Sequence, residues 1–139
     1  KLDFLIIIVT NQRCIARKII SEQELNLIHS EMLKEIRKKN GDIDAIYFCP
    51  HDKYDNCTCR KPEPGMIEKA INDLKKQKIE IDIEKSYMIG DSQSDIIAGE
   101  IVGLKTIGIS NKNELKADFV VKSLWEALQI IAQKQGLFF

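Results

Sequence analysis

Four potential metal ligands crowd into eleven residues of this 139-residue chain. Cys49, His51, Cys57 and Cys59 follow the spacing C-x-H-x5-C-x-C. Zinc prefers thiolate and imidazole ligands, and a structural zinc ion takes four of them in a tetrahedron. Two tight pairs joined by a short turn can surround one ion and leave no ligand position for water. We therefore expect a structural zinc site in residues 49–59. A disulfide would leave one of these three cysteines unpaired.

Polar residues also interrupt the apolar pattern at three other places, which are residues 10–12, 60–61 and 90–95. The hydroxyl of Thr10 and the amides of Asn11 and Gln12 are groups that can hold phosphate oxygens. Lys61 supplies a point charge for phosphate, although it could equally be a solvated surface lysine.

The third segment, residues 90–95, contains two carboxylates. Asp91 directly follows an apolar stretch, and a carboxylate there is a natural ligand for Mg²⁺, which prefers carboxylate, substrate phosphate and water. Asp95 lies one helical turn further on and could orient Asp91 or a metal-bound water. The alternative is that the two aspartates only cap a helix.

Segments with strand-like and helix-like apolar periodicity alternate along the chain. We predict strands over residues 2–10, 45–48, 86–89, 104–109 and 118–121, helices over 21–40, 64–74, 96–102 and 123–133, and a polar loop over 91–94. Capping boxes are predicted at Ser21 with Glu24 and at Ser123 with Glu126. This alternation predicts a parallel sheet in a three-layer α/β/α sandwich. Ligands of such sheets bind beyond the carboxyl ends of the strands, where the polar segments fall.

Composition narrows the class of protein. The chain has 21 Lys+Arg and 21 Asp+Glu, so its formal net charge is zero, and a nucleic-acid-binding module usually has a basic excess. The longest apolar run, residues 4–9, is too short to span a bilayer. We expect one domain over residues 1–139, no nucleic-acid or membrane partner, and a monomer. Thiolate ligands and the lack of a leader pattern favour the cytoplasm.

Taken together, these motifs resemble the last three motifs of the haloacid dehalogenase (HAD) superfamily. The resemblance rests on Thr10 after an apolar strand, Lys61 before Pro62, and Gly90-Asp91-x3-Asp95 after another strand. It is closer to one branch, because Val-Thr-Asn-Gln, Ile-Ala-Arg, Cys-Pro-His and Cys-x-Cys-Arg-Lys-Pro-x-Pro-Gly-Met resemble D-glycero-D-manno-heptose 1,7-bisphosphate phosphatases. Histidinol-phosphate phosphatases share the zinc loop and remain the alternative.

The resemblance implies a HAD-like Rossmannoid sheet and a Mg²⁺-dependent phosphatase of a small sugar phosphate. In that family an Asp attacks phosphorus, and a second Asp acts as general acid and base. The implied catalytic residues here are Thr10, Asn11, Lys61, Asp91 and Asp95, with Asp91 holding Mg²⁺. The implied substrate-binding residues are Gln12, Arg17, Arg60 and Ser92. The zinc ion, held by Cys49, His51, Cys57 and Cys59, would fix the direction of Arg60 and Lys61.

One family motif, Asp-x-Asp at the end of a central strand, does not occur in that setting in residues 1–139. Asp42 and Asp44 have the spacing, but they precede a predicted strand. Because the chain begins with Lys1, we expect the motif and its strand to lie upstream, and residues 1–139 alone to be inactive. The remaining alternative is a catalytically inactive, zinc-stabilised domain that binds phosphate or a partner.

Overall fold

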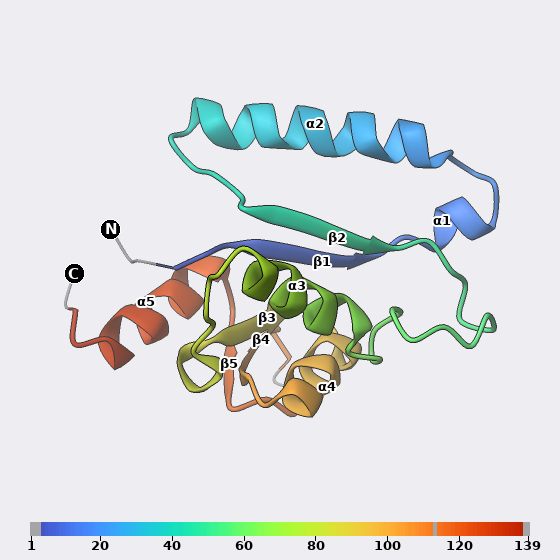
Figure 1. Ribbon diagram of the computed structural model, residues 1–139. Coiled ribbons are helices and arrows are strands. Elements are labelled where there is room, and N and C mark those ends of the chain that lie inside the picture. Colours follow the sequence, from blue (N-terminus) through green and yellow to red (C-terminus); the bar gives the residue numbers. More distant parts are fainter. Residues whose placement is uncertain (1–3, 113, 138–139) are drawn as a thin grey trace.

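The computed structural model describes residues 4–112 and 114–137 (Figure 1). The order of elements is β1 (Ile7–Asn11), α1 (Arg13–Ala16), α2 (Glu22–Lys38), β2 (Ala45–Cys49), α3 (Gly65–Lys76), a 3₁₀ turn (Ile83–Lys85), β3 (Tyr87–Gly90), α4 (Gln93–Val102), β4 (Lys105–Ile109), β5 (Phe119–Val121) and α5 (Leu124–Lys134). No helix in the described part of the chain is long and apolar enough to cross a membrane.

All strand pairs are parallel, and they form two sheets. β1 pairs with β2, and β3, β4 and β5 follow one another in the second sheet. The predicted parallel α/β architecture is therefore confirmed. Among the described strands, β1 and β3 are not hydrogen-bonded to each other. A further strand between them, expected from the resemblance, stays a prediction.

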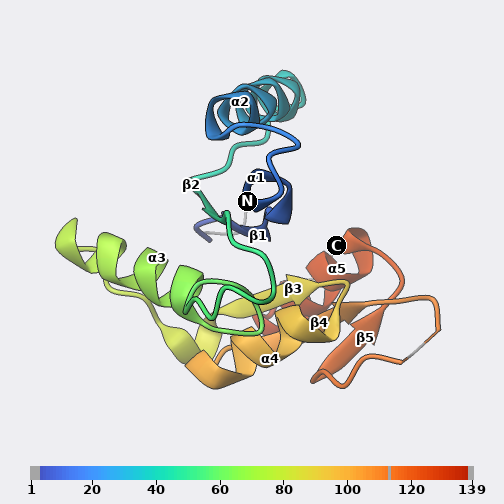
Figure 2. The same ribbon diagram turned by 90° about the vertical axis from the view of Figure 1, so that its right-hand side faces the viewer.

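Helices flank both sheets. α2 runs along one face of β1 and β2, while α3 contacts the same two strands and also α4 (Figures 1 and 2). α4 packs on β3 and β4, and α5 packs on β4 and β5. Ile67 of α3, Met88 of β3 and Ala98 of α4 form one buried cluster, with Val9 of β1 packed against it. This cluster connects the two sheets.

The helix starts show one prediction that was wrong and one that was half right. Residues 91–94 are not all loop, because α4 begins at Gln93 with Ser92 as its N-cap. Ser92 and Asp95 form a complete capping box, in which a short Asp takes the place of the usual Glu. At α5 only half of the predicted box exists: Ser123 accepts from the Glu126 amide, but the Glu126 carboxylate accepts from Lys122.

Candidate functional site

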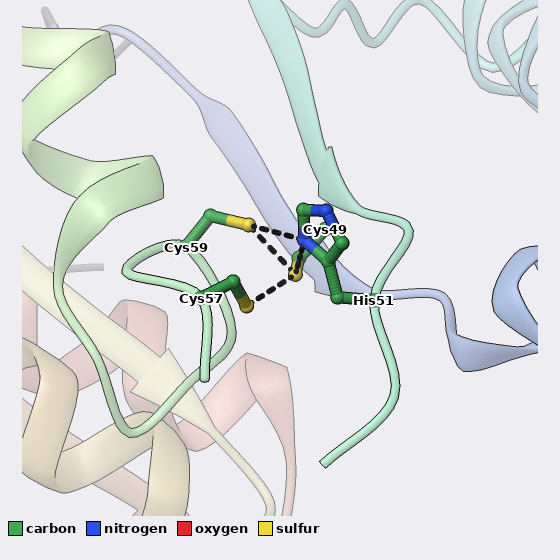
Figure 3. Close-up of side chains that lie close together, drawn as sticks. All are labelled: Cys49, His51, Cys57 and Cys59. Atoms are coloured by element: carbon green, nitrogen blue, oxygen red, sulfur yellow. Dashed lines mark hydrogen bonds between the residues drawn. The ribbon is translucent and has the colours of Figure 1, made fainter. Parts of the chain in front are cut away.

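The four predicted metal ligands converge at the end of β2 (Figure 3). Their ligand atoms all lie within 4.8 Å of one another. The Cys49 sulfur is 2.8 Å from that of Cys59 and 3.6 Å from that of Cys57, and the Nδ1 atom of His51 is 3.3 Å from the Cys59 sulfur. Thiolates about 2.3 Å from a tetrahedral zinc ion lie about 3.8 Å apart, which is close to the separation of the Cys49 and Cys57 sulfurs, whereas the Cys49 and Cys59 sulfurs would move about 1 Å further apart around the ion. Three thiols and one imidazole are a donor set that suits zinc. In such a site His51 would bind the metal through Nδ1, the ring nitrogen that lies beside the sulfurs of Cys49 and Cys59.

The three thiols differ in how readily they ionise without a cation. Burial and the neighbouring sulfurs of Cys49 and Cys57 raise the pKa of Cys59 to about 12. Burial also raises the pKa of Cys49. At Cys57 burial acts in the same direction, but hydrogen bonds from the Arg60 backbone and the other two sulfurs outweigh it and lower the pKa to about 7.

The metal-binding loop, residues 49–62, is held by β1, α1 and α3. The amide of Gln12 donates to the Cys49 carbonyl at 2.8 Å, and that of Ala16 donates to the Pro50 carbonyl at 3.1 Å. At the other side of the loop, the amide of Gly65, the first residue of α3, donates to the Thr58 carbonyl at 3.0 Å. The first turn of α3 therefore lies directly against the backbone that carries Cys59.

Substituting Gly65 with Ala is expected to displace this loop. A Cβ at Gly65 would lie 2.3 Å from the Thr58 carbonyl oxygen and 3.1 Å from the Cα of Cys59, and backbone cannot rotate away as a side chain can. We expect a loss of about 1–3 kcal/mol in the free energy of unfolding and weaker metal retention. Chemical denaturation and metal analysis check this. A matched control is Gly136→Ala, because nothing lies within 4 Å of a Cβ there, although its positive φ adds a small strain. Equal metal retention in wild type and Gly65→Ala would contradict the prediction.

Lys61 connects the two sheets at their carboxyl edge. Its Nζ donates to the Val9 carbonyl at 2.7 Å and forms an ion pair with Asp95 Oδ1 at 2.7 Å. Both side chains are nearly buried, with exposed fractions of 11% and 8%. The alternative that Lys61 is a solvated surface lysine is therefore wrong. The structure brings together the end of β1, the metal-binding loop and the start of α4.

Asp95 is both a helix cap and the partner of Lys61. Its Oδ2 accepts from the amide and the hydroxyl of Ser92 at 3.1 and 2.8 Å. Burial acts to raise the pKa of Asp95, but the bonds from Lys61 and Ser92 outweigh burial and lower it. The capping alternative is thus correct for Asp95, which also pairs with Lys61.

The lowered pKa predicts a loss of stability in acid. A carboxyl whose folded-state pKa lies below its ordinary value of 3.8 stabilises the fold above that pH, and the stabilisation is lost as the pH falls through the folded-state value. We expect the free energy of unfolding of the wild type to fall more steeply below about pH 4 than that of Asp95→Asn, which cannot titrate here. Denaturation series between pH 7 and pH 2.5 measure this difference. Parallel curves for the two proteins would contradict it.

Thr10 directly follows Val9, one partner of Lys61, and Asp91 lies four residues before Asp95, the other partner. Asp91 directly follows β3, is exposed, and makes no hydrogen bond or ion pair with the residues that the structure describes. Its carboxylate is therefore open to a cation from solvent. Thr10 lies near the end of β1, where its hydroxyl accepts a hydrogen bond from the Gln12 side chain at 3.1 Å. Asp44 lies at the opposite end of β1, where its carboxylate accepts from the Ile6 amide.

The two predicted substrate-binding arginines have different surroundings. Arg60 donates to the His51 carbonyl at 3.2 Å, and with Lys61 it lines a hollow of about 190 Å³ beside Cys57. Arg17 instead forms an ion pair with Asp52 at 2.6 Å. That pair lowers the pKa of Asp52, first through the hydrogen bond from Arg17. Substrate binding by either arginine stays a prediction.

Sequence reasoning missed Asp52, and it used Gly65 only as part of a family motif without its packing role. Asp52 pairs with Arg17 across 35 positions, and no local pattern indicates such a pair. Gly65 could have been singled out, because it opens a helix directly after Pro64, six residues beyond a potential metal ligand.

The chain matches a known protein family and several named relatives. A family model described as HAD-hydrolase-like matches residues 58–127, and the chain belongs to this family. Its relatives include proteins from Haemophilus ducreyi (38% identical, 87% of this chain and 71% of the relative) and Campylobacter jejuni (37% identical, 95% and 74%). They are named D-glycero-beta-D-manno- and D-glycero-alpha-D-manno-heptose-1,7-bisphosphate 7-phosphatase, respectively.

The chain spans a smaller share of another relative. The chain is 40% identical to a Neisseria meningitidis D-glycero-beta-D-manno-heptose-1,7-bisphosphate 7-phosphatase over 73% of its own length, and spans about half (52%) of that relative. Among solved structures, it resembles the D,D-heptose 1.7-bisphosphate phosphatase from B. bronchiseptica complexed with magnesium and phosphate. The TM-score is 0.81 at 27% identity, covering 95% of this chain and 76% of the other.

Proposed function

We propose that residues 1–139 form the larger part of a Mg²⁺-dependent phosphatase that removes the C7 phosphate of D-glycero-D-manno-heptose 1,7-bisphosphate. The observation that carries the proposal is the nearly buried Lys61, which joins the end of β1 to the start of α4, the helix that follows β3 and Asp91. A fixed cation and an exposed carboxylate, both at the carboxyl ends of parallel strands, suit an anionic substrate and a divalent cation together. The names of the relatives supply the heptose bisphosphate as substrate.

In this proposal each residue has a separate task. Thr10 donates its hydroxyl hydrogen to the transferring phosphoryl group, and Lys61 offsets its negative charge. Asp91 would hold Mg²⁺, and the bound cation would help to neutralise the phosphate oxygens. Arg60 and Arg17 bind the substrate. The nucleophilic Asp and its acid–base partner come from outside residues 1–139. The nucleophile attacks phosphorus and displaces the C7 oxygen, which the acid–base partner protonates. Water then hydrolyses the aspartyl-phosphate and releases phosphate.

The metal cluster of Cys49, His51, Cys57 and Cys59 would bind zinc in a structural role. All four ligand positions are filled by protein side chains, so no position is open for a reacting water. Cys59 is followed directly by Arg60 and Lys61. A bound ion would thereby fix the backbone that presents both cations to the substrate.

Phosphate release from two substrates tests the proposal. D-glycero-D-manno-heptose 1,7-bisphosphate and histidinol phosphate are assayed with Mg²⁺, using residues 1–139 and the same chain with any residues that its gene encodes before Lys1. We expect phosphate release from the heptose substrate, and only by the longer of the two proteins. Asp91→Asn should lower its kcat by about a hundredfold or more, because the cation that offsets phosphate charge loses its ligand.

The other outcomes separate the alternatives. Faster release from histidinol phosphate would reassign the substrate and keep the reaction. Release by residues 1–139 alone would contradict an external nucleophile. No release by either protein would favour a zinc-stabilised binding domain without catalytic activity.

A further inference from the structure

The side-chain amide of Asn11 forms a reciprocal pair with the backbone of Lys61. Its Nδ2 donates to the Lys61 carbonyl at 3.1 Å, and its Oδ1 accepts from the Lys61 amide at 3.0 Å. Both kinds of hydrogen-bonding group of the amide are thereby used, and both backbone groups of Lys61 are satisfied. Two hydrogen bonds fix the orientation of a peptide segment, whereas a single bond would leave the segment free to rotate about it.

Asn11 is itself firmly placed, whereas Lys61 lies in irregular chain. Asn11 is the last residue of β1, and its partner in the register with β2 is Cys49. No helix or strand lies between the end of β2 at Cys49 and the start of α3 at Gly65. The pair therefore fixes this irregular loop to β1 at Lys61, the residue whose amine also contacts Asp95 of α4.

We propose that Asn11 is a positioning residue, which holds the backbone of Lys61 so that the Lys61 amine reaches both the Val9 carbonyl and the Asp95 carboxylate. An ordinary lysine side chain loses much rotamer freedom when it is held in one place, so an unanchored backbone would make this placement costlier. The position of Nζ is defined by contacts at 2.7 Å to two different elements, so a displaced backbone would require the side chain to adopt another rotamer to keep both contacts. This differs from the direct catalytic role expected for Asn11 from the sequence.

The catalytic meaning of this role rests on the proposed function, but the placement of Lys61 does not. The test therefore reads out the Lys61–Asp95 pair without turnover. The Asp95 carboxyl carbon is titrated by ¹³C NMR in wild type and Asn11→Ala, and its signal is identified by its loss in Asp95→Asn. Acetylation of Lys61 by a small anhydride is followed by mass spectrometry in the same proteins.

We expect Asn11→Ala to raise the pKa of Asp95 by about one unit, because the opposite charge no longer lies beside it. Acetylation of Lys61 should become severalfold faster. Asn11→Thr removes the amide but suits a strand, so it serves where the Ala variant does not fold. Asn26→Ala is the control, since Asn26 is exposed on α2 away from Lys61, and should change neither quantity.

A purely structural role gives a different result. In that case the variants of Asn11 would melt at a lower temperature, while the folded protein would keep the wild-type pKa of Asp95 and the slow acetylation of Lys61. That result would overturn the proposal. A lack of phosphatase activity in the longer protein would leave these measurements unaffected, so failure of the proposed function and failure of this inference can be told apart.

Discussion

Replacing Lys61 with Met should destabilise the fold by about 3 kcal/mol, the largest effect expected from any one side chain of the site. The substitution removes the cation from an ion pair whose two side chains are only 11% and 8% exposed. Asp95 would then lie buried with Ser92 as its remaining partner, and an unpaired buried carboxylate is costly. Urea denaturation followed by circular dichroism measures the free energy of unfolding.

The chain provides a matched control for this substitution. Lys69 also pairs with an aspartate, Asp73, at 2.6 Å, but its side chain is 64% exposed. Lys69→Met makes the same change of charge and shape, and it should cost less than about 1 kcal/mol. The double variant Lys61→Met with Asp95→Asn should lose less stability than the two single variants added together, because no unpaired charge remains. Equal losses for Lys61→Met and Lys69→Met would show that burial of the pair contributes nothing.

Loss of a zinc ion from the cluster of Cys49, His51, Cys57 and Cys59 should have the second large effect. We expect about one zinc ion per chain in purified protein, and its loss in Cys59→Ser or after chelation. Because ligands are assembled only in the folded chain, metal binding adds to folding stability, and the melting temperature should fall by roughly 10 °C or more. Elemental analysis and thermal denaturation measure the two quantities.

Cys14→Ser is the control for this experiment. The Cys14 sulfur donates to the Gln12 side chain at 3.4 Å and takes no part in the cluster of four ligands. This variant should keep its zinc and nearly all of its melting temperature. Zinc bound as tightly by Cys59→Ser as by wild type would contradict the ligand assignment, and a metal-free, fully stable wild type would contradict the site itself.

Some of this architecture was predictable because its causes are local. Apolar periodicity located each strand and each of the longer helices, since burial of one face depends on neighbours a few positions away. The predicted start of the first strand was wrong, because residues 4–6 precede β1, and the predicted residues 2–3 lie outside the described part of the chain. The helix start at Gln93 was misplaced for a physical reason. Ser92 was taken as a polar loop residue and Asp95 as a cap only in the alternative interpretation, yet both side chains satisfy free amides where the helix opens. The short helix α1 has no capping side chain at its start, so its sequence carried little signal.

The sequence by itself determined that four potential metal ligands lie together, because they belong to one short segment and little chain must be folded to bring them together. It also determined the parallel α/β class. Only the tertiary structure decided which groups meet at the strand ends. The Asn11–Lys61 pair joins residues 50 positions apart, and the Arg17–Asp52 pair joins residues 35 apart. Such pairs depend on how the loop after β2 folds against the end of β1 and against α1, and no local pattern of residue types encodes that path.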